Sequence, residues 1–151
     1  MKKYPVIYFL ISLCVFALDQ LTKYFIKTHI GLFDIVRITS FLNIVHVMNT
    51  GSAFGLFRNL GNLFFIIVAL LAMTLITVLI IKDSRNRLAF ALILGGSAGN
   101  LADRIMFGHV IDFLDFYAGS HHWWAFNVAD SALTIGISLL FLRTVFEKKS
   151  S

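Results

Sequence analysis

The sequence predicts an all-α membrane protein with four transmembrane helices and a small extracytoplasmic β-sheet. Its composition is the first reason: 58% of the 151 residues are hydrophobic and only 14% are charged, values outside the range of an ordinary soluble domain. The second reason is that four apolar segments can each cross a hydrocarbon core about 30 Å thick, which takes about 20 residues. The third is a pair of short β-branched runs in one connection. We expect one integral membrane domain over residues 1–151.

The expected spans cover residues 5–27, 63–81, 88–106 and 129–146, and the outward connections are 28–62 and 107–128. The second span is apolar except for Thr74 and Thr77, whereas the other three carry ionisable residues near one end. In the third span, Gly95 and Gly99 lie four residues apart. Small residues at this spacing predict close packing against a neighbouring helix.

The first span also resembles a secretory signal peptide, because MKK precedes an apolar run that contains Cys14. No small-residue cleavage site follows this run, and apolar residues continue at helical spacing past Asp19. We therefore expect an uncleaved transmembrane helix. Because Cys14 is the only cysteine of the sequence, no intramolecular disulfide is expected.

Basic residues are unevenly distributed along the chain. Connections on the cytoplasmic side of a membrane carry an excess of Lys and Arg, so we expect both termini and the middle connection to be cytoplasmic. The high pI then needs no nucleic acid partner, since the basic residues lie where topology requires them. The residues concerned are Lys2, Lys3, Lys82, Arg85, Arg87, Arg143, Lys148 and Lys149, with only Asp83 and Glu147 among them.

Three carboxylates are predicted at a similar depth, near the outer edge of the bilayer. Asp19 and Asp103 each lie 16 residues beyond a cytoplasmic basic residue of their own helix, a rise of roughly 24 Å. Asp130 precedes Arg143 by 13 residues, or about 20 Å. Ionisable groups inside a membrane are costly and usually functional, so this convergence predicts a site.

Each of these acids has polar neighbours about one helical turn away. Each group also has a simpler interpretation. Asp19 with Lys23 fits an interfacial ion pair, and Asn100 with Asp103 and Arg104 fits the hydrated end of a helix. Asn127 with Asp130 fits a capping box at a helix N-terminus.

The connection 28–62 is too polar to span a membrane. Its runs IVRIT and FLNIVHV are short and rich in β-branched residues, which predicts a small antiparallel sheet on the membrane surface. In NTGSAFGLF, Asn49 offers amide donors and an acceptor, while Gly51 and Gly55 allow tight turns. The apolar residues expected to enter the interface are Ala53, Phe54, Leu56 and Phe57.

Asp112 is the informative residue of the connection 107–128. In an extended strand Asp112 and Leu114 share one face, and Asp115 points to the other. If this strand crosses the outer mouth of the bundle, Asp112 meets Asp130 and Asp115 is solvated.

The connection 107–128 also contains tryptophans and histidines, and neither indicates a metal centre. Trp123 and Trp124 are typical of anchors at the lipid headgroups. The histidines lack the spacing of metal ligands and are expected at the surface; they are His109, His121 and His122.

Five stretches of the chain carry a resemblance when taken together. They are DQLTK at 19–23, NTGSAFG at 49–55, GNLADR at 99–104, HVIDF at 109–113 and FNVADS at 126–131. In this order, on four predicted spans, the chain resembles the lipoprotein signal peptidase (signal peptidase II) family over nearly its whole length. The resemblance implies an aspartic endopeptidase of the bacterial cytoplasmic (inner) membrane. Its substrates would be diacylglyceryl-modified prolipoproteins, cleaved on the N-terminal side of the lipid-modified cysteine.

By this resemblance, Asp112 and Asp130 are the catalytic pair, and globomycin-type inhibitors are expected in the same cleft. The connection 28–62 is similar to the family's surface cradle. Many relatives have a proline where this chain has Trp124, so the resemblance does not predict the path of that loop. The supporting and substrate-binding positions implied are Asp19, Lys23, Asn49, Gly51, Asn100, Asp103, Arg104 and Asn127.

Two adjacent carboxylates suit peptide hydrolysis, because they cannot both ionise cheaply and therefore share a proton. The ionised member takes a proton from water while the protonated member donates a hydrogen bond to the scissile carbonyl oxygen. This chemistry needs no metal or other cofactor. A site at the outer membrane edge would let the diacylglyceryl chains of the substrate remain in lipid.

Two other functions are compatible with charged residues in a membrane. A small transporter or proton relay would spread its carboxylates through the membrane depth and often contains an inverted repeat. Here the acids gather at one edge, and no repeat is evident. A structural membrane subunit would tolerate Asp-to-Asn changes in its outward connections.

Overall fold

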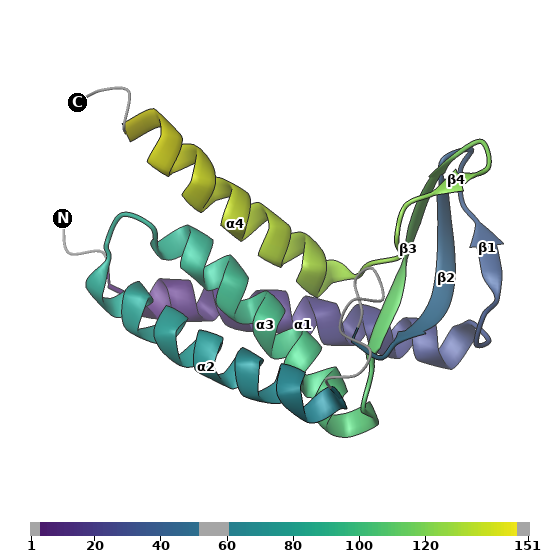
Figure 1. Cartoon of the computed structure of the whole chain (residues 1–151), viewed down its shortest axis with the longest axis horizontal. Helices are drawn as coiled ribbons and strands as arrows, with labels where there is room; N and C mark the ends of the chain where they lie inside the picture. The colour runs from purple at the N-terminus through teal and green to yellow at the C-terminus, as the bar shows by residue number, and fades with distance from the viewer. Residues whose placement is uncertain (1–3, 52–60, 148–151) are drawn as a thin grey trace.

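Helices make up most of the molecule, and a small sheet lies at one end (Figure 1). The computed structural model describes residues 4–51 and 61–147. The helices are α1 (Val6–His29), α2 (Gly61–Lys82), α3 (Arg87–Phe107) and α4 (Val128–Glu147). The strands are β1 (Ile35–Arg37), β2 (Leu42–Asn49), β3 (Val110–Ala118) and β4 (His121–His122). All four predicted helices are present, each with ends close to the expected residues.

Three of the described helices, α1, α2 and α4, have the length and apolar composition of membrane spans. Their apolar side chains face outward: Leu13, Leu71 and Phe141, one from each helix, are 59%, 68% and 67% exposed. Apolar surface on this scale is stable in lipid and costly in water. The predicted third span, α3, is helical throughout, with its charged residues near its two ends.

α3 is the central helix, because it packs against α1, α2 and α4. Its glycines permit this close approach. A Cβ on Gly95 would collide with the backbone of α1, and a Cβ on Gly96 would collide with the backbone of Ala129 in α4. Gly99 meets α1 at Asp19. The predicted small-residue packing face at Gly95 and Gly99 is therefore confirmed.

The strands form one antiparallel sheet in the order β1-β2-β3-β4. The two runs predicted as strands in the first connection are β1 and β2. β2 contains a bulge, since it has one residue more than β3 between the pairs Ile44↔Leu114 and Val47↔Asp112. A bulge bends and twists its strand, and bulges are common beside functional sites.

The segment before α4 returns to the sheet. The N–H of Leu114 donates to the carbonyl oxygen of Phe126 at 2.8 Å, and the N–H of Phe126 donates back at 3.1 Å. These bonds hold the first turn of α4 beside β3. The prediction that the strand carrying Asp112 lies across one end of the fourth helix is therefore confirmed.

One prediction for β3 is wrong: Asp115 is not solvated but 6% exposed. The turn after β3 brings β4 back along it, and His122 Nδ1 lies 2.9 Å from the Asp115 carboxylate. Asn43 Nδ2 of β2 donates to the same carboxylate at 2.8 Å. Strand parity alone assigns Asp115 to the face opposite Asp112, but it does not reveal that a hairpin covers that face.

Several surface predictions stay untested. Residues 53–57, expected to enter the membrane interface, lie outside the described residues. Trp123 and Trp124 are 70% and 61% exposed, and their anchoring to lipid headgroups remains a prediction, as does the position of the sheet on the membrane surface.

Candidate active site

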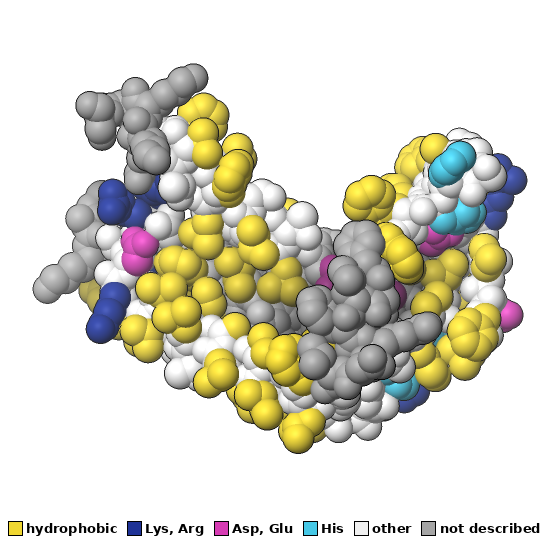
Figure 2. Space-filling model, in the orientation of Figure 1, with side chains coloured by type: hydrophobic (Ala, Val, Ile, Leu, Met, Phe, Trp, Pro, Cys, Tyr) yellow, Lys and Arg dark blue, Asp and Glu magenta, His cyan; other side chains and the backbone are white. Residues whose placement is uncertain are grey.

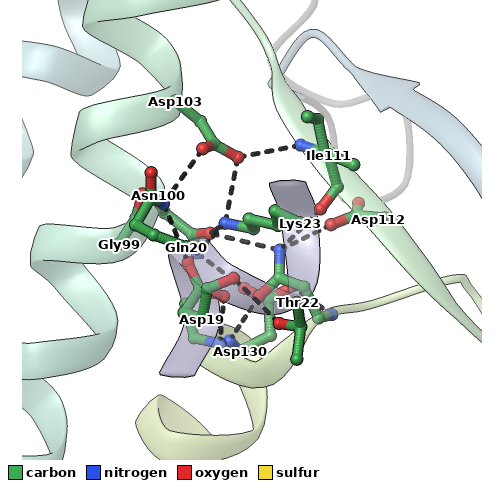
Figure 3. Close-up of polar contacts among 12 residues, drawn as sticks. Asp19, Gln20, Thr22, Lys23, Gly99, Asn100, Asp103, Ile111, Asp112 and Asp130 are labelled. Carbon is green, nitrogen blue, oxygen red and sulfur yellow. Dashed lines mark hydrogen bonds and ion pairs between the residues drawn. The ribbon is translucent and has the colours of Figure 1, made fainter. Parts of the chain in front are cut away.

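Asp112 and Asp130 come from different elements and meet where the sheet joins the helices (Figure 3). Asp112 lies in β3 and is 2% exposed. Asp130 lies in the first turn of α4. Asparagine side chains donate to both carboxylates, and one residue, Asn127, contacts both aspartates.

Asn127 joins the two aspartates through its side-chain amide. Its Nδ2 donates to Asp112 Oδ1 at 2.7 Å, and its Oδ1 accepts the backbone N–H of Asp130 at 2.8 Å. Asp130 Oδ2 accepts the backbone N–H of Asn127 at 3.3 Å. The bonds between Asn127 and Asp130 form the predicted capping box. That interpretation is confirmed but incomplete, because the same amide also orients Asp112.

The second oxygen of Asp112 is held from β2. Asn49 Nδ2 donates to Asp112 Oδ2 at 2.9 Å, and Asn49 Oδ1 accepts the backbone N–H of Gly51 at 3.0 Å. Gly51 has a φ of 119°, a conformation that is open to glycine and rare for other residues. The tight turn predicted at Gly51 is therefore confirmed, and it orients the amide of Asn49.

Asp130 is held from α3. Asn100 Nδ2 donates to Asp130 Oδ1 at 2.8 Å. Asn100 Oδ1 accepts hydrogen bonds from Lys23 Nζ at 3.1 Å and from Asn127 Nδ2 at 3.2 Å. Asn100 therefore links the carboxylate pair to a charged cluster on α1 and α3.

That charged cluster is a buried ion triad (Figure 3). Lys23 Nζ lies 2.8 Å from Asp19 Oδ2 and 2.9 Å from Asp103 Oδ2, and none of the three side chains is more than 2% exposed. An interfacial ion pair at Asp19 and a hydrated helix end at Asp103 are therefore both excluded. Burying charges is costly unless they are paired and fully hydrogen-bonded, and this triad meets that condition.

The triad also holds the backbone beside each aspartate of the pair. Asp19 Oδ1 accepts the N–H of Ala129 at 2.8 Å, and Asp103 Oδ2 accepts the N–H of Ile111 at 3.0 Å. Ala129 and Ile111 are the residues immediately before the two aspartates. These bonds hold the start of α4 against α1 and the start of β3 against α3.

Gln20 belongs to this cluster and was not predicted from the sequence. Its Nε2 lies 3.2 Å from Asp19 Oδ2, 3.2 Å from the Gly99 carbonyl oxygen and 3.1 Å from Asp103 Oδ1. Gly99 makes this possible, because a Cβ there would collide with the Asp19 carboxylate. A signal for Gln20 was present, since Gln20 and Lys23 are three residues apart on one helix face.

Arg104 is the remaining predicted residue, and its charge acts on both Asp112 and Asp130. Its guanidinium carbon lies 4.5 Å from the centroid of the Phe65 ring, a cation–π contact. Arg104 Nη1 is buried and makes no hydrogen bond to any residue within 4–51 and 61–147. A buried donor without an acceptor is costly, so Arg104 is suited to bind an oxygen atom of a ligand.

The environment of Asp112 changes its protonation. Burial, followed by the nearby charge of Asp130, raises the pKa of Asp112 from 3.8 to about 7, against the opposing hydrogen bonds of Asn49 and Asn127. Near neutral pH Asp112 therefore holds a proton for much of the time. A protonated carboxyl beside an ionised one can perform general acid–base hydrolysis.

Within the described ranges, no three His, Cys, Asp or Glu side chains are grouped so as to hold a metal ion. His121 and His122 are exposed, as predicted, whereas His109 is partly buried. The ring of His122 stacks on Tyr117 with centroids 5.2 Å apart, beside Asp115 on the sheet.

Known proteins resemble this chain over most of its length. The family model described as Signal peptidase (SPase) II matches residues 11–146. The lipoprotein signal peptidase of Thermodesulfovibrio yellowstonii is 44% identical over 131 residues, which cover 87% of this chain and 89% of the relative. That of Syntrophus aciditrophicus is 44% identical over 162 residues, covering 99% and 98%.

Two solved structures are similar to this fold. A bacterial membrane enzyme determined by the in meso method at 2.3 Å resolution gives a TM-score of 0.88 and 32% identity, covering 95% of this chain and 90% of that one. Another, at 1.9 Å resolution, gives a TM-score of 0.82 and 33% identity over 91% of each chain.

Proposed function

Because this chain belongs to the signal peptidase II family, we propose that Asp112 and Asp130 are the catalytic pair of its peptidase site. The enzyme is an aspartic-type membrane endopeptidase that processes prolipoproteins. One observation carries the proposal: the buried amide of Asn127 bonds to Asp112 while it caps the turn that presents Asp130.

In this mechanism the two carboxyl groups share one proton. Burial and then the charge of Asp130 raise the pKa of Asp112 to about 7, so Asp112 can hold this proton near neutral pH. The carboxylate of Asp130 removes a proton from a water molecule, whose oxygen attacks the carbonyl carbon of the scissile peptide. Asp112 donates a hydrogen bond to the carbonyl oxygen, on which negative charge develops. Collapse of the tetrahedral intermediate breaks the C–N bond, and the leaving amine takes a proton from the pair.

The surrounding residues act as positioning and binding groups. Asn49, Asn100 and Asn127 hold the carboxylates in fixed orientations, which lowers the reorganisation needed in the transition state. Arg104 is suited to bind a carbonyl oxygen of the substrate backbone, because its buried Nη1 has no hydrogen-bond acceptor among the described residues.

We further propose that α3 is a fourth span and that both termini are cytoplasmic. The basic residues at the α2–α3 turn and near the C-terminal end of α4 support this orientation. The carboxylate pair would then lie near the extracytoplasmic face of the bacterial cytoplasmic (inner) membrane.

This placement fits a lipid-modified substrate. The diacylglyceryl chains of a prolipoprotein would stay in the bilayer while the signal helix presents its C-terminal end to the aspartates, with cleavage on the N-terminal side of the modified cysteine. Globomycin-type inhibitors would compete for the same cleft.

A transporter or proton relay is not favoured. Its carboxylates would be spread along a path through the membrane, whereas Asp19, Asp103 and Asp130 are joined in one cluster through Lys23 and Asn100.

The direct test is cleavage of a diacylglyceryl-modified precursor by the purified enzyme in detergent micelles. Asp112→Asn and Asp130→Asn should each lower kcat/KM roughly a thousandfold or more, as is typical when one member of a catalytic unit is removed. Thermal unfolding of each variant should show that the protein remains folded.

Asp115→Asn is the matched control. Asp115 lies on the same strand and is also buried, but it bonds to Asn43 and His122. This variant should keep cleavage activity. Full activity in either dyad variant, or an equal loss in Asp115→Asn, would contradict the assignment.

A further inference from the structure

α4 separates from α3 at the end of the bundle opposite the carboxylate pair (Figure 1). Gly136 is the last buried residue of α4 among the described side chains, and a Cβ there would collide with Ile93 of α3. Beyond it, Leu139, Leu142 and Phe146 are 40%, 48% and 63% exposed. The close contact between α3 and α4 therefore ends near Gly136.

A pocket of about 470 Å³ lies between the two helices beyond this point. Two arginines line it, Arg85 from the α2–α3 turn and Arg143 from α4. The apolar side chains that line it are Leu88, Leu139, Leu142 and Phe146. The pocket therefore combines a basic part with an apolar part.

The turn that carries Arg85 is held in place by hydrogen bonds. Asp83 accepts the backbone N–H of Arg85 at 2.9 Å and the side-chain amide of Asn86 at 2.7 Å. Arg143 Nη1 donates to the Arg85 carbonyl oxygen at 2.6 Å. This last bond ties α4 to the turn and places a guanidinium, with its planar fork of N–H donors, beside the Arg85 backbone.

Basic residues outnumber acidic residues at this end of the bundle. Figure 2 shows basic side chains gathered at the end of the bundle that holds the chain termini. Arg85 and Arg143 stand there with Lys82 and Arg87, beside the acidic Asp83. Arg87 does not line the pocket, whereas Arg85 and Arg143 do, so these two arginines are the groups placed to receive an anion.

Membrane position restricts the occupant. Two candidate spans, α2 and α4, end at this level, so the pocket opens where hydrocarbon gives way to headgroups. Its apolar walls favour an acyl chain over water. Guanidinium groups match the geometry of phosphate oxygens. An anionic phospholipid carries both parts in one molecule.

We propose that this pocket binds one anionic phospholipid, with its phosphate on Arg85 and Arg143 and an acyl chain along Leu139 and Leu142. The site is separated from Asp130 by about 20 Å of helix α4. It does not depend on the catalytic assignment proposed above.

The test is native mass spectrometry of the full chain in detergent micelles, titrated with phosphatidylglycerol or with phosphatidylcholine of the same acyl chains. The protein should bind one phosphatidylglycerol with roughly tenfold preference over phosphatidylcholine. Arg143→Gln and the double variant Arg85→Gln/Arg143→Gln should lose this preference. Leu139→Trp leaves the net charge unchanged and should also weaken binding, because the larger side chain fills the apolar part.

Lys82→Gln is the matched control, since it removes one positive charge from the same end outside the pocket, and it should keep the preference. Precursor cleavage should persist in all these variants, which verifies their fold. Equal binding of both lipids by the unmodified protein would overturn the proposal. An equal effect of Lys82→Gln and Arg143→Gln would also overturn it, because it would indicate diffuse charge attraction. Displacement of the lipid by inorganic phosphate at the same concentration would indicate a phosphate site and likewise overturn it.

Discussion

Asn127 donates a 2.7 Å hydrogen bond to Asp112 from the position that caps α4. A helix cap normally serves its own helix, by accepting an orphan backbone N–H. In Asn127 the amide oxygen accepts the N–H of Asp130, and the amide nitrogen donates to Asp112 of β3. The start of α4 and the carboxylate of Asp112 are therefore positioned by the same side chain. Five expected outcomes follow from this arrangement and its surroundings.

Asn127→Ala should lower both stability and activity. It removes the acceptor of the Asp130 N–H and the donor to Asp112, and loss of a cap with a buried hydrogen bond costs about 1–3 kcal/mol. The measurements are thermal unfolding and kcat/KM for precursor cleavage. Asn43→Ala is the control, because Asn43 also donates to a buried aspartate of β3, Asp115. It should lower stability and leave kcat/KM little changed, and equal activity losses would show that Asn127 has only a structural role.

Lys23→Met should be strongly destabilising. It leaves Asp19 and Asp103 as buried carboxylates without their cation, a change that costs about 3–5 kcal/mol. Lys27→Met is the matched control one turn further along α1, where the lysine is exposed, and should change stability by about 1 kcal/mol or less. Thermal unfolding in the same detergent compares the two, and similar melting temperatures would contradict a structural ion triad.

The rate of cleavage should fall as the pH rises above about 7, where Asp112 loses the shared proton. The Asn49 hydrogen bond lowers the pKa of Asp112, so Asn49→Ala should raise this pKa and move the fall in rate to higher pH. The measurement is kcat/KM as a function of pH for both proteins. An unchanged profile, or a shift to lower pH, would show that Asp112 does not control the alkaline side.

The same raised pKa has a consequence for folding. The folded-state pKa of about 7 lies above the ordinary value of 3.8, so between these two pH values the folded protein retains a proton that the unfolded chain has lost. The contribution of Asp112 to the free energy of unfolding therefore decreases as the pH rises through this window. Asp112→Asn should remove this part of the pH dependence.

Chelators should leave cleavage intact, because two carboxyl groups and water suffice for the proposed hydrolysis. The measurement is precursor cleavage before and after treatment with EDTA. Loss of activity that is restored by a divalent metal ion would contradict the mechanism.

Much of this architecture was predictable from local patterns. The four helices follow from apolar length, and β1 and β2 follow from short β-branched runs, because these patterns involve residues that are near one another in sequence. The constant rise per residue of a helix also predicted that Asp19, Asp103 and Asp130 lie at a similar level. The structure joins the three in one cluster through Lys23 and Asn100.

Other features could not be predicted from sequence patterns, because they depend on contacts between residues that are far apart in the sequence. Spacing could not establish that β4 covers Asp115. Gln20 shares a helix face with Lys23, but spacing could not show that its amide reaches Gly99 and Asp103 of α3. The role of Asp19 depends on the N–H of Ala129, 110 positions away.

The sequence by itself determined that the chain has membrane-spanning helices and carboxylates at one level of the bundle, since apolar length and helical rise are properties of short segments. Only the tertiary structure decided that Asn127 links Asp112 to the first turn of α4, which carries Asp130, and that Lys23 joins the acids of α1 and α3. The physical reason is that hydrogen bonds between separate elements form only after α3 has packed against α1 and α4 and the Phe126 segment has paired with β3.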